Sequence, residues 1–128
     1  MEAIEHIEPG EKVLNNRQEN VIEIRGLKKF FGDKKVLTNI NLTVKKGENV
    51  VILGRSGMGK SVTIQCLIGM LAPDGGTIKV LGKNVPELDN IELKELRTKI
   101  GFLFQGAALY DSMTVRENME FPLTRVLK

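Results

Sequence analysis

The sequence predicts an α/β fold in which an antiparallel β region precedes a strand, a glycine-rich loop and a helix. Two observations carry this prediction. Apolar and polar residues alternate over 36–44, which is the period of a half-buried strand. A glycine-rich run over 54–61 stands between a short apolar segment and a longer one of helical composition. With 128 residues, 41% of them apolar, the chain can form one domain with a modest core.

The patterns place the strands in order along the chain. Residues 1–20 are acidic, contain a Pro-Gly pair and lack apolar periodicity, so a mobile tail is expected there. The folded part is expected to begin at residue 21. Strands are predicted near 21–24 and over 36–44, 49–53, 77–81 and 100–104. The continuously apolar strand 49–53 is expected to be buried on both faces.

Three helices are predicted between and after these strands, over 61–71, over 91–97 and from Thr114 onward. The first is apolar nearly all round and is therefore expected to be buried, with Cys66 as an inert core residue. Thr114 and Glu117 have the spacing of a capping box, which fixes the start of the third helix. Pro122 is expected to interrupt or kink that helix.

Composition excludes several classes of function. No apolar run approaches the ~20 residues of a membrane helix, and the N-terminus lacks the basic start and apolar stretch of a secretory signal. His6 and Cys66 are the only histidine and the only cysteine in the sequence. This excludes catalytic pairs of a serine or cysteine nucleophile with histidine, and it excludes zinc sites built from cysteines. The net charge of +3 suits a phosphate-bearing ligand or an ordinary surface and does not indicate a nucleic-acid partner.

The run over 54–61 matches the pattern G-x-x-x-x-G-K-[ST] of a phosphate-binding loop. Its glycines let the backbone N–H groups point inward, and the start of the following helix faces the same anion. Lys60 would reach the β- and γ-phosphates, and the Ser61 hydroxyl would ligate Mg²⁺. The alternative is a glycine-rich turn with an exposed lysine. The candidate phosphate-binding residues are Gly54, Arg55, Ser56, Gly57, Met58, Gly59, Lys60 and Ser61.

Three segments together resemble the ATP-binding subunit of ABC transporters. Residues 26–32, GLKKFFG, resemble the adenine-stacking loop of that family, which selects Phe31 as the stacking ring and Val36 as the apolar residue behind the base. Residues 54–61 are close to the family's serine- and glycine-rich loop, and residues 71–78 resemble its next turn. Residues 100–105 end in Gln105 and are similar to the Q-loop. The alternatives are that Phe30 or Phe31 is a core residue and that Gln105 is structural.

The resemblance implies a P-loop NTPase core with an N-terminal antiparallel β subdomain, truncated before the helical subdomain. It implies that ATP and Mg²⁺ are bound, with Ser61 and Gln105 as metal ligands. It also implies a head-to-tail homodimer and a membrane-spanning permease contacted by the segment after Gln105. The expected location is cytoplasmic, at the inner face of the inner membrane through that permease.

Residues 103–115, LFQGAALYDSMTV, are similar to the Mla and Mce-type branch of the family, which implies phospholipid transport. The family's later motifs have no counterpart here: the signature motif, the Walker B aspartate with its catalytic glutamate, and the switch histidine. We therefore expect no catalytic residue within these 128 residues, and binding of Mg-ATP without appreciable hydrolysis. The alternatives are a truncated, non-catalytic nucleotide-binding fragment and a soluble ABC protein outside transport.

Overall fold

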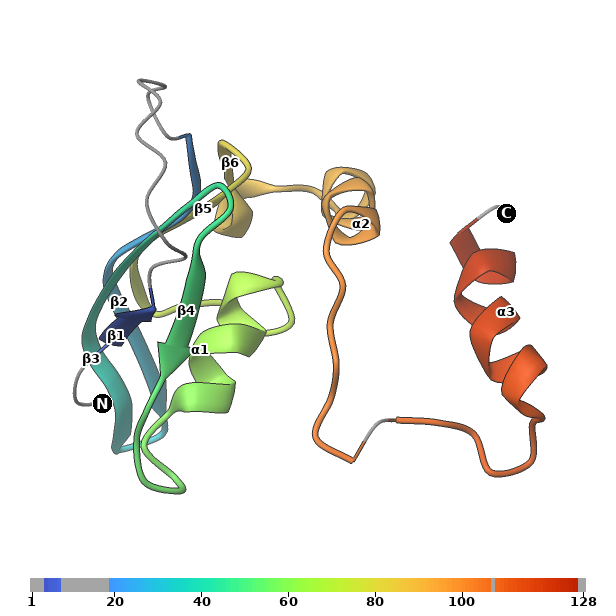
Figure 1. Cartoon of the computed structure of the whole chain (residues 1–128). Coiled ribbons are helices and arrows are strands. Elements are labelled where there is room, and N and C mark those ends of the chain that lie inside the picture. Colours follow the sequence, from blue (N-terminus) through green and yellow to red (C-terminus); the bar gives the residue numbers. More distant parts are fainter. Residues whose placement is uncertain (1–3, 8–18, 107, 127–128) are drawn as a thin grey trace. The chain divides into compact units, whose positions relative to one another are not determined.

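The computed structural model describes residues 4–7, 19–106 and 108–126, and the chain divides into two compact units, residues 1–93 and 94–128. The first unit holds most of the secondary structure (Figure 1). Its elements are β1 (Ile4–Ile7), β2 (Asn20–Phe31), β3 (Lys34–Lys45), β4 (Asn49–Ile52), α1 (Lys60–Leu67), β5 (Gly75–Val80), β6 (Lys83–Asn84) and the 3-10 helix η1 (Val85–Glu87). Helix α2 (Asn90–Thr98) crosses the division between the units, and α3 (Val115–Val126) belongs to the second. Among the residues described, no helix is both long and apolar enough to cross a bilayer.

Four strands form an antiparallel sheet in the order β3-β2-β5-β6. The alternation predicted for the second strand is confirmed, because Leu42 and Val44 on β3 are buried while Asn41 and Thr43 are exposed. The core of the first unit comprises Ile24, Leu27, Leu37, Leu42, Val44, Cys66, Ile68, Ile78, Val80 and Val85. The predicted antiparallel β subdomain is therefore present, and it supports the segment that follows it.

Strand β2 is much longer than predicted. The sequence suggested an end near Gly26, but β2 continues to Phe31. Gly26 takes a left-handed conformation with φ of 59° inside the strand, and the pairing with β3 shifts register between Ile24 and Leu27. A bulge therefore absorbs the glycine without ending the strand.

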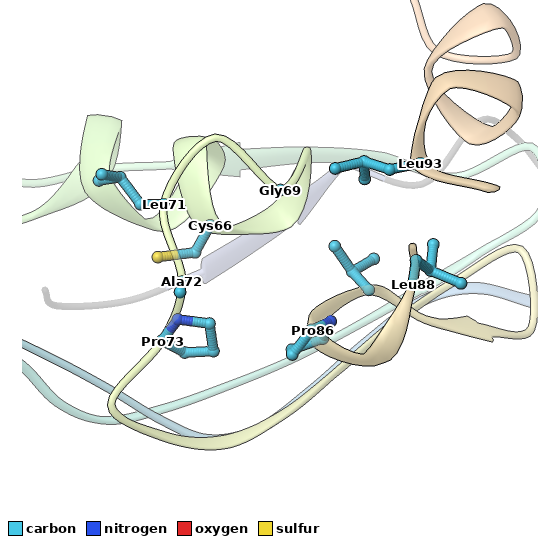
Figure 2. Close-up of a pocket in the computed structure, with 9 residues that line it drawn as sticks. Cys66, Gly69, Leu71, Ala72, Pro73, Pro86, Leu88 and Leu93 are labelled. Atoms are coloured by element: carbon cyan, nitrogen blue, oxygen red, sulfur yellow. The ribbon is translucent and has the colours of Figure 1, made fainter. Parts of the chain in front are cut away.

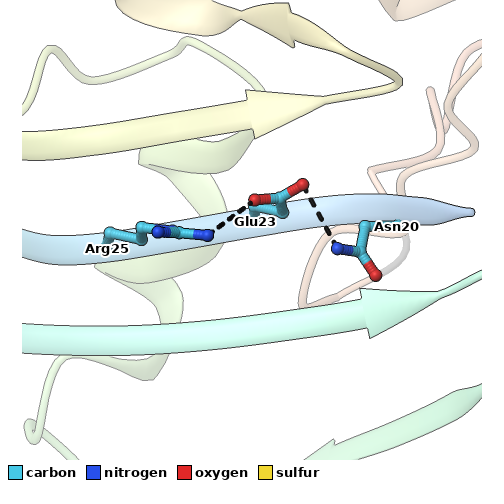
Figure 3. A network of polar contacts seen from close by, with 3 residues as sticks. All are labelled: Asn20, Glu23 and Arg25. Carbon is cyan, nitrogen blue, oxygen red and sulfur yellow. Dashed lines mark hydrogen bonds and ion pairs between the residues drawn. The ribbon is translucent and has the colours of Figure 1, made fainter.

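The outer face of β2 carries a small polar network. The carboxylate of Glu23 accepts hydrogen bonds from Asn20 at 3.3 Å and from Arg25 at 3.4 Å (Figure 3). The Arg25 side chain is 77% exposed, so this ion pair adds little stability.

Strand β4 pairs antiparallel with β1, with Ile4 opposite Ile52 and Ile7 opposite Asn49. The sequence analysis missed β1, which lies within the predicted mobile tail; residues 1–3 and 8–18 lie outside the described residues. The expectation that β4 is buried on both faces is wrong, since Val51 is 41% exposed. The described residues give β4 a single neighbouring strand, in a two-stranded sheet separate from the larger one, which leaves part of its apolar surface uncovered.

Helix α1 packs on β3 and β5 and is shorter than predicted. Its buried positions are Thr63 and Cys66, whereas Ile64 is 37% exposed, so the expectation of burial nearly all round is wrong. The helix ends because Gly69 adopts a φ of 71°. The N–H of Gly69 then donates to Cys66 O at 3.1 Å, and that of Met70 donates to Gln65 O at 2.8 Å. These two bonds form a Schellman C-cap.

The second unit contains the predicted capping box. The N–H of Thr114 donates to the Glu117 carboxylate at 2.7 Å, and the N–H of Glu117 donates to the Thr114 hydroxyl at 3.2 Å. Helix α3 continues through Pro122 to Val126, so Pro122 does not interrupt it. The strand predicted over 100–104 is wrong, because these residues have no regular secondary structure and no partner strand among the described residues.

Candidate phosphate-binding site

The loop between β4 and α1 has the backbone that its glycines allow. Gly57 and Gly59 adopt φ values of 82° and 91°, in the left-handed region that residues with a Cβ rarely occupy. Gly59 is the N-cap of α1, so the turn delivers the chain directly into the helix at Lys60. The predicted order of strand, glycine-rich loop and helix is therefore present.

Lys60 directs its ammonium group back across this loop. Its Nζ donates a hydrogen bond to the carbonyl oxygen of Gly54 and another, at 3.1 Å, to that of Arg55. Phosphate oxygens are stronger acceptors for an ammonium group than neutral carbonyls. The position of Lys60 therefore fits a bound polyphosphate, which would take the place of these carbonyls as its partner.

The first turn of α1 is fixed to the loop and carries no competing anion. The N–H and the hydroxyl of Thr63 both donate to Gly59 O at 2.9 Å, and there is no acidic residue in the first turn. The first N–H groups of a helix lack partners within the helix and attract anions. This end of α1 therefore suits a phosphate group.

Ser61 is exposed at the second position of α1, and its role as a Mg²⁺ ligand stays a prediction. In the described part of the chain, no three His, Cys, Asp or Glu residues cluster to hold a metal ion. Mg²⁺ commonly keeps water and substrate phosphate among its ligands and needs few protein groups. The donor set at α1 is therefore compatible with Mg²⁺ arriving together with a nucleotide.

Val36 lies against the phosphate loop. In the pairing of β2 with β3, Lys29 lies opposite Leu37 and Phe30 lies opposite Lys35. Val36 is therefore the extra residue of a β-bulge. A Cβ atom placed on Gly59 would lie 3.2 Å from Val36 Cγ1 and 3.3 Å from its carbonyl oxygen. The structure thus brings Val36 and the loop 54–61 together. The role of Val36 behind the base stays a prediction.

Phe31 stands at the end of β2 opposite Lys34 and is 46% exposed, while Phe30 is half-buried. The Lys29 ammonium group lies over the Phe31 ring, 5.3 Å from its centre. An exposed aromatic ring can stack on a base, and this distance is within the range of a cation–π contact. The role of Phe31 in base stacking stays a prediction.

Gln105 is exposed and belongs to the second unit, in a turn that follows Phe104. The loop 54–61, Val36 and Phe31 all belong to the first unit. The role of Gln105 as a metal ligand stays a prediction.

A small cavity of about 130 Å³ lies between the end of α1 and η1 (Figure 2). It is lined by Cys66, Gly69, Leu71, Ala72, Pro73, Val85, Pro86, Leu88 and Leu93, none of which has a charged side chain. Cys66 is fully buried, which confirms its assignment to the core. Burial raises the pKa of the Cys66 thiol, which favours its protonated form.

Two residues with several contacts were missed by the sequence analysis. Asp74 contacts Lys28, Lys29 and Phe30 across the sheet, and Asn118 joins α3 to the turn before it. An aspartate between proline and glycine signals a turn, but nothing in the sequence reveals a partner 44 residues away.

Comparison with known proteins identifies the family of this chain. The sequence profile of the family described as ABC transporter matches residues 37–127. The methionine import ATP-binding protein MetN of Clostridium tetani is 48% identical over 103 residues, covering 80% of this chain and 32% of MetN. The probable ribonucleotide transport ATP-binding protein mkl of Mycobacterium bovis is 45% identical over 102 residues, covering 80% of this chain and 28% of that protein. The chain thus spans about a third of the length of these relatives.

Solved structures give the same result for the fold. A dimeric structure of MJ0796, described as a bacterial ABC transporter cassette, superimposes with a TM-score of 0.74 and 35% identity, covering 84% of this chain and 48% of the other. A second MJ0796 structure, in a post-hydrolysis state bound to ADP and Pi, gives a TM-score of 0.72 and 34% identity, covering 82% and 47%. With the loop, the helix and the antiparallel sheet in place, the chain belongs to the ABC transporter family of ATP-binding cassettes.

Proposed function

We propose that this chain binds Mg-ATP through residues 54–61 as the nucleotide-binding part of an ABC transporter ATPase. The observation that carries the proposal is the position of the Lys60 ammonium across a loop whose Gly59 begins α1. Backbone N–H groups, the helix end and this lysine together supply positive charge where a triphosphate carries its negative charge. Ser61 and Gln105 would hold Mg²⁺, and Phe31 and Val36 would hold the base. Bound Mg²⁺ would neutralise charge on the β- and γ-phosphates.

In this proposal the chain binds nucleotide and leaves hydrolysis to groups outside residues 1–128. Attack by water needs a positioned base or orienting residue besides a phosphate cradle. A second subunit, arranged head to tail, would cover the γ-phosphate. The dimeric cassette among the solved structures supports such a pairing. The alternative is a truncated product that only binds nucleotide. It predicts the same affinity for Mg-ATP, but no ATP hydrolysis in an assembly with any other subunit.

The segment after Gln105 would contact the membrane permease. Its Leu109 and Tyr110 are 67% and 50% exposed, which gives the turn an apolar surface. Contiguous exposed apolar groups mark interaction sites. Through this contact the subunit would lie at the cytoplasmic face of the inner membrane.

The contact can be tested by placing a photo-crosslinking amino acid at Leu109 in the native protein in its own cells. Lys79, exposed on β5, is the control position. We expect crosslinks to a membrane-spanning protein from position 109 and none from position 79. If neither position yields a membrane protein, the permease contact is wrong and a soluble ABC protein is favoured.

For the transported substrate, we propose a phospholipid or a related lipid. The similarity of residues 103–115 to the Mla and Mce-type branch supports this, as does 41% identity over 114 residues to the Arabidopsis thaliana protein TRIGALACTOSYLDIACYLGLYCEROL 3, chloroplastic, whose name contains a glycerolipid. That match covers 88% of this chain and 32% of the plant protein. The second candidate is methionine import, favoured by the 48% identity to MetN.

Proteoliposomes that contain the native transporter complex separate these two candidates. We expect ATP-dependent movement of labelled phospholipid between membranes and no uptake of labelled methionine. Uptake of methionine without lipid movement would contradict the lipid proposal and support the second candidate.

A further inference from the structure

Asp74 is attached to β2 by both its backbone and its side chain. It lies between α1 and β5, one residue before β5 begins at Gly75, which pairs with Lys28. The N–H of Asp74 donates to Lys28 O at 2.8 Å, and its carboxylate accepts the N–H of Phe30 at 2.6 Å. A carboxylate that accepts a backbone N–H forms a charge-assisted bond, which is stronger than a neutral one. Asp74 therefore extends the attachment of β2 on the β5 side two residues beyond Lys28, where its pairing with β5 ends.

The same carboxylate places Lys29. The Lys29 ammonium group lies 3.6 Å from Asp74 Oδ2, and only 14% of the Lys29 side chain is exposed. Lys29 and Phe31 point to the same face of β2 because side chains alternate along a strand. The ammonium group lies over the Phe31 ring at 5.3 Å. Asp74 thus acts on Phe31 in two ways, through the backbone of Phe30 and through the charge of Lys29.

Asp74 itself is held in place by the glycines that follow it. Gly76 adopts a φ of 87°, and a Cβ atom there would lie 2.6 Å from the carbonyl oxygen of Arg25. This close approach fixes the start of β5 against β2 at Arg25 and Gly26, near the hydrogen bond between Asp74 and Lys28. The position of the carboxylate is therefore set by the backbone of two strands.

We propose that Asp74 is a positioning residue for nucleotide binding, which sets Phe31 for stacking on the base through Lys29 and the Phe30 N–H. The inference deepens the proposed function and rests on it. The Phe31 ring, which Lys29 contacts, keeps 46% of its surface exposed. This leaves room for the planar ring of a base beside it. Asp74 acts on the base part of the nucleotide and leaves the phosphate part to residues 54–61.

The test compares two probes on the full chain, Mg-ATP and Mg-tripolyphosphate, which lacks the base. We expect Asp74→Ala to weaken ATP binding three- to tenfold and to change tripolyphosphate binding less than twofold. Asp74→Asn keeps an acceptor for the Phe30 N–H but loses the charge that holds Lys29, so an intermediate effect is expected. Lys29→Met should resemble Asp74→Asn. Equal weakening of both probes, or no change in either, overturns the proposal.

Two further variants separate this inference from the proposed function. Phe31→Ala should weaken ATP binding and leave tripolyphosphate binding unchanged, and Lys60→Met should weaken both probes. If Lys60→Met acts as expected but Phe31→Ala has no effect, nucleotide binding stands while base stacking and the role of Asp74 are wrong. If the unaltered chain binds neither probe, both proposals fail.

A spectroscopic measurement covers the case in which Asp74→Ala does not fold. In Phe31→Trp, ATP should quench the tryptophan emission, and tripolyphosphate should not. Adding the milder change Asp74→Asn should reduce the quenching at saturating ATP. Unchanged quenching would overturn the proposal.

Discussion

Gly59 lies directly against Leu37. A Cβ atom on Gly59 would be 2.5 Å from Leu37 Cδ2, and Leu37 is 1% exposed on β3. Because Leu37 is surrounded by the core, its side chain cannot move away at little cost. The contact attaches the phosphate loop to the antiparallel sheet and requires a residue without a side chain at position 59.

Replacing Gly59 with alanine should therefore destabilise the chain by two additive effects. A residue with a Cβ at φ of 91° costs about 1–2 kcal/mol, and overpacking against Leu37 costs about 1–3 kcal/mol more. Gly82 is the matched control, with φ of 79° and no atom within 4 Å of its added Cβ. Urea unfolding should show Gly59→Ala losing more stability than Gly82→Ala. Equal losses would mean that the contact with Leu37 contributes nothing.

Cys66 should be protected from alkylation in the folded chain. It is fully buried on α1, and burial raises the pKa of its thiol. Since the thiolate is the reactive form, both effects lower the rate. Iodoacetamide labelling followed by mass spectrometry should be at least 100-fold slower in buffer than in 6 M guanidinium chloride. Rapid labelling in buffer would contradict the position of Cys66 in the core.

Acid should loosen the start of α3 through Glu117. The Thr114 backbone N–H and the Thr114 hydroxyl both donate to its carboxylate, which lowers the pKa of Glu117 below the ordinary 4.5. A lowered pKa in the folded state means that the charged form contributes stability above pH 4.5, and that this contribution is lost as pH falls through the lower value. The amide signal of Thr114 should shift over this acidic range.

Glu117→Gln should abolish that pH-dependent shift, because glutamine does not titrate. Glu120→Gln, on the same helix and 3.8 Å from Arg116, is the control and should keep it. A Thr114 signal that is independent of pH in the unaltered chain would contradict the capping box.

Asn118 should hold the turn before α3. Its side-chain oxygen accepts the N–H of Tyr110 at 2.8 Å, and its nitrogen donates to the carbonyl oxygens of Tyr110, Met113 and Thr114 at 3.0–3.1 Å. Loss of these bonds in Asn118→Ala should cost about 1–2 kcal/mol, because each hydrogen bond has a modest net value. Hydrogen exchange of the Tyr110 amide should accelerate accordingly.

Asn118→Asp should be at least as harmful, since a carboxylate would face three carbonyl oxygens and could donate to none. Met119→Ala, at a residue that is 72% exposed, is the control for the same helix. Slow exchange of Tyr110 in Asn118→Asp would show that the nitrogen of Asn118 does not hold the turn.

Local patterns predicted the parts of this chain that depend on near neighbours. The alternation that ends at Val44, the glycines before Lys60 and the pair Thr114 and Glu117 each act within a few residues, and each has the expected local structure. Gly69 also acts locally, and the C-cap of α1 could have been predicted from it.

Features that depend on distant partners could not be predicted. The exposure of Val51 depends on which strands cover β4, and the residues around Leu103 have no partner strand among the described residues. The contact from Asp74 to Phe30 spans 44 residues, so no periodicity could reveal it. Pairing of this kind is set by the tertiary structure.

A calorimetric titration with Mg-ATP tests the central claim most directly. It compares the unaltered chain with Lys60→Met. The Lys60 ammonium group lies across the loop, and a hydrogen bond to a charged group is worth about 1.5–3 kcal/mol, so Lys60→Met should weaken binding about 10- to 100-fold. Lys79→Met, on the exposed face of β5, should bind like the unaltered chain. If the unaltered chain does not bind Mg-ATP, or if Lys60→Met binds it within twofold of the unaltered affinity, residues 54–61 are not its phosphate site.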